Sequence, residues 1–230
     1  QALGAAMDRA LALAPSALGS GDVEARRAEL ARMEALRVLR ELSLRADARN
    51  VPAHPALRAV ALAPQVERPT TALIAIERAL SWRASTRRPG TAPHPLTVVL
   101  SGPPGVGKST AAARVVTRWS RPARFVRARE VAALASWESV ERNRLGSVPL
   151  LAVDEAGLEE GDRAGARIAG LLCERADQPF VTIVVTNLDA AAFRARYVDD
   201  RLASRLASQE ALGCGWWEEI GGDDLRQVIA

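Results

Sequence analysis

Hydrophobic positions along the 230-residue chain follow two spacings, and each spacing predicts a different kind of element. Short apolar runs rich in β-branched residues predict buried strands. In chain order these runs occupy residues 96–100, 148–153 and 180–185, and two further segments, 124–127 and 216–220, are also predicted strands. Apolar positions three or four residues apart predict helices over residues 22–48, 70–82, 107–119, 128–135 and 161–176. Asp162 is the predicted N-cap of the last of these helices. The length and this pattern predict one sizeable α/β domain with a smaller appendage.

The appendage lies at the N-terminal end. Residues 1–21 are rich in alanine and end in proline and glycine, so we predict a loop there. Asp22 is the predicted N-cap of the helix over residues 22–48, whose apolar side consists of Leu30, Met33, Leu36, Leu39 and Leu42. Such a helix either packs on the rest of the chain, which we favour, or docks on a partner. We place the boundary near residue 50, with a helical extension over 1–50 and the main domain over 51–230.

The loop between the strand at 96–100 and the helix at 107–119 carries a phosphate-binding motif. Its sequence fits G-x-x-x-x-G-K-[ST], known as the P-loop. The backbone N–H groups of such a loop, and the N-terminus of the helix after it, point at a bound anion. The sequence therefore predicts a nucleotide-binding site made of Gly102, Pro103, Pro104, Gly105, Val106, Gly107, Lys108, Ser109 and Thr110.

Lys108 is the only lysine among 31 lysine and arginine residues. Arginine takes every other basic position, including surface positions where lysine would serve. A compact ammonium on a flexible stem reaches the β- and γ-phosphates of a nucleotide, whereas a planar guanidinium replaces it poorly. We expect Lys108 to hold the phosphate chain and to be solvated when no nucleotide is bound.

Two acids follow the apolar run at 148–153, an arrangement typical of a Walker B strand. Asp154, at the C-terminal end of the predicted strand, can hold the shell of a Mg²⁺ ion. Glu155 can orient and polarise the attacking water. The position of these acids, about 45 residues after the P-loop, favours this interpretation over a chance pair.

Three further polar residues are candidates for contact with the γ-phosphate. Asn187 stands at the tip of the strand at 180–185, as a sensor of the γ-phosphate or as the start of a turn. Arg201 and Arg205 share a helix face at spacing i,i+4. Asp199 and Asp200 can neutralise Arg201, so we favour Arg205 as the charge supplied to a neighbouring subunit's nucleotide and keep Arg201 as the alternative.

Charge and composition narrow the classes of partner and compartment. The net charge of +4 and the pI near 9.9 permit a nucleic-acid partner without demonstrating one. A local basic cluster, read as a solvated face with a nucleic-acid or intersubunit role as the alternative, consists of Arg121, Arg124, Arg127 and Arg129. No uncharged apolar run reaches about 18 residues, so no membrane span is expected. Cys173 and Cys214 lack metal-ligand spacing, so we expect a reduced, cytoplasmic protein.

With these residues assembled, the chain resembles the AAA+ ATPases of the DnaC-like helicase loaders and the IstB-like transposition helpers. The similarity runs from about residue 50 to Arg226. It rests on four segments in the family's order: GPPGVGKST, LLAVDEAGLE at 150–159, TIVVTNLD at 182–189 and DDRLASRL at 199–206. The resemblance implies a three-layer αβα sandwich of the P-loop NTPase type with a parallel sheet, and an ATPase that uses ATP and Mg²⁺.

The resemblance also implies a role for each matching residue. Lys108 and Ser109 become ligands of the phosphates and of Mg²⁺, and Asp154 becomes the second metal ligand. Glu155 becomes the catalytic acid of the Walker B pair. Asn187 becomes sensor 1 and Arg205 the arginine finger, while Arg226 is a candidate for the sensor 2 role.

For the biological function, the resemblance implies a factor in DNA replication. Such a factor oligomerises on single-stranded DNA in an ATP-dependent way and delivers a replicative helicase. One alternative is an IstB-like helper that binds target DNA for a transposase. Another is an adaptor that binds nucleotide with little hydrolysis, against which the intact pair Asp154 and Glu155 argues.

Overall fold

The structure is a computed structural model, and it describes residues 20–52, 55–63, 69–134, 140–161, 163–197, 202, 215–222 and 224. Contacts along the chain divide it into two units, Gln1–Ser43 and Leu44–Ala230. Among the residues described, no helix is long and apolar enough to cross a bilayer.

Helix α2 (Ser20–Ala48) confirms the long helix predicted near the N-terminus. It begins at Ser20, so Asp22 lies inside the helix and is not its N-cap. Of the five predicted apolar side chains only Leu42 is buried, and the other four are 37–62% exposed: Leu30, Met33, Leu36 and Leu39.

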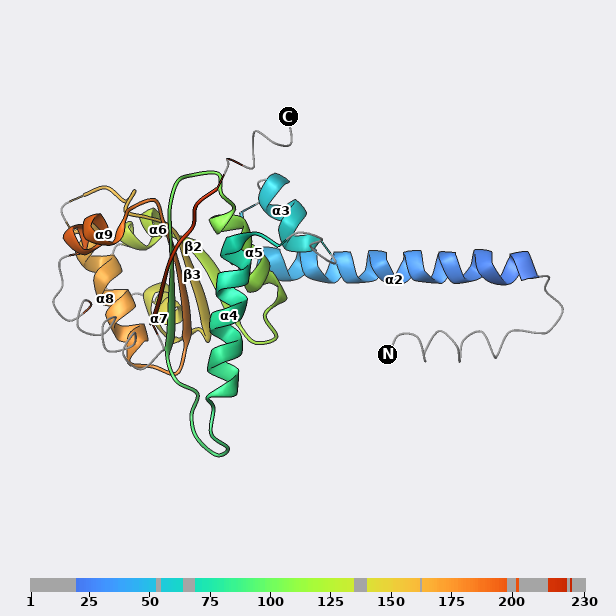
Figure 1. Ribbon diagram of the computed structural model, residues 1–230, viewed down its shortest axis with the longest axis horizontal. Helices are drawn as coiled ribbons and strands as arrows, with labels where there is room; N and C mark the ends of the chain where they lie inside the picture. Colours follow the sequence, from blue (N-terminus) through green and yellow to red (C-terminus); the bar gives the residue numbers. More distant parts are fainter. Residues whose placement is uncertain are drawn as a thin grey trace. The chain divides into compact units, whose positions relative to one another are not determined.

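The second unit is built on a parallel sheet of five strands in the order β2-β3-β4-β1-β5 (Figure 1). The strands are β1 (Leu96–Ser101), β2 (Ala123–Arg127), β3 (Leu150–Ala156), β4 (Val181–Thr186) and β5 (Gly215–Glu219). They confirm all five predicted strands. Every residue of β1 and β4 is buried, as expected for parallel strands covered on both faces.

Helices cover both faces of the sheet and make a three-layer α/β fold (Figure 1). One face carries α4 (Thr71–Ser85) and α5 (Lys108–Arg118), with α3 (Pro55–Leu62) packed on α5. The other carries α6 (Ala128–Ala132), α7 (Val140–Ser147), α8 (Ala164–Ala176) and α9 (Ala190–Arg196). Each face has its own apolar core. This arrangement confirms the predicted fold class.

The helix boundaries agree with the sequence pattern in part. The Thr70 hydroxyl accepts a hydrogen bond from the Leu73 amide at 3.2 Å, so Thr70, predicted as the first residue of this helix, is the N-cap of α4. Helix α6 ends at Ala132, earlier than predicted, and the predicted N-cap of α8, Asp162, lies outside the described residues. The sequence pattern did not predict the three short helices α3, α7 and α9.

The strand order determines where polar residues meet. Strands β3, β4 and β1 are neighbours and run parallel, so their C-terminal ends lie at one edge of the sheet. The P-loop follows β1, Asp154 and Glu155 lie near the end of β3, and Asn187 follows β4. Ligands of open parallel sheets bind outside this edge.

Candidate nucleotide-binding site

The P-loop leads directly into the N-terminus of α5. Gly107 is the N-cap of this helix with φ +88°, and no side chain caps the first turn. The helix begins at Lys108, so the amides of its first turn and the preceding loop face the same edge of the sheet. A helix N-terminus without a side-chain cap is well suited to binding a phosphate.

Two glycines of the loop are required by a close approach of the chain after β5. A Cβ on Gly102 would lie 2.1 Å from the Ile220 carbonyl oxygen, and one on Gly105 would lie 2.0 Å from the Asp224 Oδ1. Both glycines also have positive φ, +135° and +88°, which other residues rarely adopt. The Ile220 amide donates to the Ser101 carbonyl at 2.7 Å, so the chain after β5 stays beside the end of β1, where the P-loop begins.

Lys108 is buried, with 4% of its surface exposed, which contradicts the expectation that it is solvated without nucleotide. Its ammonium donates to the carbonyls of Gly102 and Pro103 at 2.7 and 2.6 Å and to the Asn187 Oδ1 at 3.1 Å. Burial lowers the pKa of Lys108, while the charge of Asp154 opposes this effect. The lysine therefore joins the P-loop to the residue predicted as sensor 1.

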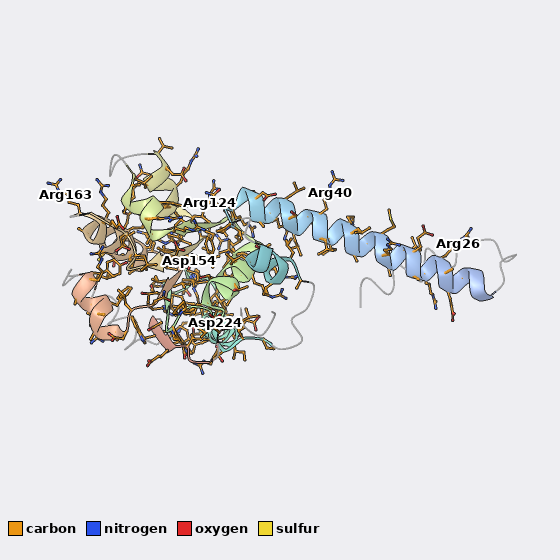
Figure 2. The ribbon with its side chains drawn as sticks, turned by 90° about the horizontal axis from the view of Figure 1, so that it is seen from above. Arg26, Arg40, Arg124, Asp154, Arg163 and Asp224 are labelled. Carbon is orange, nitrogen blue, oxygen red and sulfur yellow. The ribbon has the colours of Figure 1, made fainter. Side chains whose placement is uncertain are left out.

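Asp154 and Ser109 meet at the same edge. The Ser109 hydroxyl donates to the Asp154 Oδ1 at 2.8 Å, although the two residues are 45 positions apart. Asp154 is 4% exposed and lies enclosed among the side chains of this unit (Figure 2). Burial raises the pKa of Asp154, and the Ser109 hydrogen bond opposes this effect. A carboxylate and a hydroxyl oxygen are ligands that Mg²⁺ accepts alongside phosphate oxygens and water.

Glu155 differs from Asp154 in exposure and in backbone conformation. Its side chain is 38% exposed, so water reaches it, and its φ of +56° lies in the left-handed region. The Arg127 Nε lies 3.7 Å from the Glu155 Oε2. This pair was not predicted, because Arg127 belongs in sequence to the basic cluster of Arg121, Arg124 and Arg129. The sequence signal for the pair was the position of Arg127 at the C-terminal end of the strand that follows the P-loop helix.

Hydroxyl groups link the ends of the three strands. The Thr186 Oγ1 donates to the Ala156 carbonyl at 2.7 Å and accepts from the Leu188 amide at 3.0 Å. The Ser101 hydroxyl donates to the Leu188 carbonyl at 2.7 Å. These hydrogen bonds fix the end of β3, the loop that carries Asn187 and the end of β1 relative to one another.

The remaining predicted site residues are not all described. Thr110 lies in the first turn of α5 and is half-buried. Arg201, Arg205 and Arg226 lie outside the described residues.

The predicted basic cluster is only partly a solvated face. Arg124 donates to the Ala48 carbonyl at 2.7 Å, at the end of α2, and Arg127 pairs with Glu155.

Comparisons with known proteins show what the fold is similar to. No protein-family profile matches the chain, and no curated protein sequence matches it. Among solved structures, DnaI superposes with a TM-score of 0.53 at 19% identity over 76% of this chain and 95% of that one. The DnaC helicase loader gives 0.50 at 15% identity over 68% and 94% of the two chains. AMPPCP-bound DnaA from Aquifex aeolicus gives 0.50 at 19% identity over 74% and 52%. At these identities the similarity shows the fold alone.

Proposed function

We propose that this chain is an AAA+ ATPase that binds Mg²⁺-ATP and hydrolyses it to ADP and phosphate. The observation that carries the proposal is the convergence of five side chains at one edge of the sheet: Lys108, Ser109, Asp154, Glu155 and Asn187. They come from three separate segments, and each is of the type that phosphoryl transfer requires.

Each side chain has a distinct task in this proposal. The loop amides and Lys108 bind the phosphate chain, and the ammonium exchanges its carbonyl acceptors for phosphate oxygens. Ser109 and Asp154 hold Mg²⁺, which neutralises charge on the β- and γ-phosphates. Glu155, the exposed acid of the pair, accepts a proton from the attacking water and orients it. Asn187 contacts the γ-phosphate, which connects the nucleotide state to the loop after β4.

Hydrolysis is tested with purified protein, Mg²⁺-ATP and a phosphate-release assay. We expect steady turnover by the wild-type protein. Glu155→Gln should keep ATP affinity, because the side chain does not hold the phosphates, and should slow turnover by about 10²-fold or more. Glu160→Gln, which changes an exposed acid nearby, is the matched control and should hydrolyse ATP at the wild-type rate. Equal turnover by wild type and Glu155→Gln would place the catalytic base elsewhere.

We further propose that the ATPase acts in DNA replication as a helicase-loader-like factor, oligomerising on single-stranded DNA when ATP is bound. Two structural neighbours support this choice: one is described as a helicase loader, and another is the replication initiator DnaA bound to AMPPCP and single-stranded DNA. A pull-down with the host's replicative helicase, with and without ATP, tests it. Lys108→Ala should lose the ATP-dependent part of the capture. ATP-dependent capture of a transposase in a parallel pull-down, without capture of the helicase, would favour the IstB-like alternative.

A further inference from the structure

A buried carboxylate lies four residues after Glu155. Glu159 is 2% exposed, and each oxygen of its carboxylate has a donor. The Gly157 amide and the Tyr197 hydroxyl donate to Oε2 at 2.8 and 3.2 Å, and the Arg196 Nε donates to Oε1 at 3.2 Å. Another nitrogen of the same guanidinium donates to the Glu159 carbonyl. Glu160, the next residue, is exposed.

The backbone between Glu155 and Glu159 departs from a regular strand. The pairing of β3 with β4 shifts register between Val153 and Ala156, so Asp154 and Glu155 lie in a bulge. Glu155 has φ +56°, a conformation that costs a non-glycine residue about 1 kcal/mol or more and persists only where neighbours hold it. A bulge re-aims side chains next to a site, and here it separates the buried Asp154 from the exposed Glu155.

Hydrogen bonds hold this bulge on its C-terminal side. The Leu158 amide donates to the Glu155 carbonyl at 3.1 Å, closing the turn. The Gly157 amide, inside that turn, donates to the Glu159 carboxylate. Glu159 in turn is tied to the end of α9 through Arg196 and Tyr197. The turn that carries Glu155 is therefore anchored to α9 by one carboxylate.

We propose that Glu159 is a positioning residue for hydrolysis, which keeps the bulge in the conformation that presents Glu155 to the attacking water. This inference rests on the proposed ATPase function. Glu159 itself does not reach the water, because its side chain is fully buried and its oxygens are engaged. It acts through the backbone of Gly157 and Leu158.

The role requires a carboxylate and not only a polar side chain of this size. Three donors converge on Glu159, and a carboxylate accepts all of them. Burial and the charge of Glu159 raise the pKa of Tyr197, so its hydroxyl remains a donor. An amide at position 159 has one acceptor oxygen, and its NH₂ group would face one of these donors. Glu159→Gln therefore loosens the anchor while preserving volume.

The first test compares Glu159→Gln with Glu160→Gln. We expect Glu159→Gln to lower kcat by about 10- to 100-fold, the scale of a small misplacement of a catalytic group, with the ATP dissociation constant within about threefold of wild type. Hydrogen exchange should show faster exchange of the Gly157 amide in this variant. Glu160→Gln should match wild type in all three measurements. A wild-type kcat for a folded Glu159→Gln would overturn the inference.

A double-mutant cycle tests whether Glu159 acts through Glu155. If it does, Glu159→Gln should change kcat little in the Glu155→Gln background, because the group that it positions is already lost. If Glu159→Gln lowers kcat by the same factor in both backgrounds, its effect is independent of Glu155 and structural in a general sense. That result would also overturn the inference. If Glu159→Gln does not fold, Tyr197→Phe removes a single hydroxyl from the cluster. That variant must then lower kcat, and an unchanged kcat refutes the proposal.

Different outcomes would refute the proposed function and the positioning role of Glu159. If the wild-type protein does not hydrolyse ATP, the proposed function fails, whatever the variants do. If wild type hydrolyses ATP and the Gly157 amide exchanges at the same rate in Glu159→Gln, the positioning role alone fails.

Discussion

Asp154, the carboxylate that we propose as a metal ligand, lowers the stability of the fold at neutral pH because it is buried. Burial raises its pKa above the value of 3.8 in the unfolded chain. Between these two pKa values the folded state binds more protons than the unfolded state. The free energy of unfolding therefore falls as pH rises through this window, and the charged carboxylate destabilises the fold at neutral pH. Bound Mg²⁺ would offset this cost.

We predict that Asp154→Asn is more stable than wild type at neutral pH without Mg²⁺. Asparagine keeps an acceptor for the Ser109 hydroxyl and carries no charge to bury. The difference should shrink as pH is lowered to about 4, because Asp154 of the wild type then becomes neutral as well. Calorimetric melting at a series of pH values measures this. A less stable variant at neutral pH would show that the Ser109 hydrogen bond outweighs burial.

Lys108→Ala tests the single lysine of the chain. We predict a loss of ATP affinity of about 10- to 100-fold or more, the scale of hydrogen bonds to a charged donor. Titration calorimetry measures the affinity. Because Lys108 also bonds two loop carbonyls and Asn187, we expect a lower melting temperature but a retained fold. Unchanged ATP affinity in the folded variant would contradict the nucleotide site.

At the scale of elements, arginine side chains hold many helix ends in this fold. Their guanidinium groups donate to backbone carbonyls that a helix terminus leaves without partners. Five helix ends have such an arginine donor: Arg124 at α2, Arg114 at α3, Arg49 at α5, Arg167 at α6 and Arg175 at α7. Several planar donors per side chain suit this task better than an ammonium does. The arginine bias of the composition therefore has a structural use.

Arg175 is the most buried of these arginines, with 1% of its surface exposed. Its nitrogens donate to the Thr182 hydroxyl and to four carbonyl oxygens, at distances of 2.8–3.2 Å. The carbonyls belong to Leu145, Gly146, Val148 and Val181, so one side chain joins α8, the end of α7 and the beginning of β4.

We predict that Arg175→Met lowers the free energy of unfolding by about 3–5 kcal/mol, because five buried or half-buried acceptors lose the charged donor that Arg175 supplies. Urea unfolding measures this value. Arg163→Met is the matched control at the start of the same helix, where Arg163 is exposed, points outward (Figure 2) and makes no capping hydrogen bond. It should change stability by less than about 0.5 kcal/mol. Equal effects of the two substitutions would show that the buried hydrogen bonds contribute little.

At the scale of the whole molecule, the open question is whether one subunit completes the site of the next. If Arg205 supplies charge to a neighbour's γ-phosphate, Arg205→Ala should bind ATP nearly normally and lose hydrolysis by about 10³-fold or more. Mixing it with Lys108→Ala subunits should restore activity, because one interface then pairs an intact P-loop with an intact arginine. Steady-state turnover of the mixture measures this.

The same mixture with Arg201→Ala distinguishes the two candidate arginines. Complementation by Arg201→Ala but not by Arg205→Ala would identify Arg201 as the finger. Activity that survives both substitutions and does not depend on protein concentration would exclude hydrolysis completed in trans.

The sequence alone predicted the five strands and the position of the P-loop between β1 and α5. Buried parallel strands read as continuous apolar runs, and the loop motif is a local backbone conformation, so both are contained in short stretches of chain. The family resemblance implied that Ser109 and Asp154 hold the same Mg²⁺ ion, but the hydrogen bond between them was found only in the structure. The three short helices α3, α7 and α9 were missed, since eight residues or fewer carry too little periodicity.

Only the tertiary structure decided the state of each polar side chain at the site. The burial of Lys108 depends on Asn187 and on the packing of β4 beside β1. The pair of Arg127 with Glu155 depends on β2 lying next to β3. The anchoring of the bulge by Glu159 depends on the end of α9. Burial, hydrogen bonding and pKa arise from groups distant in sequence, so a pattern read along one chain predicts candidate site residues but not the contacts that tune them.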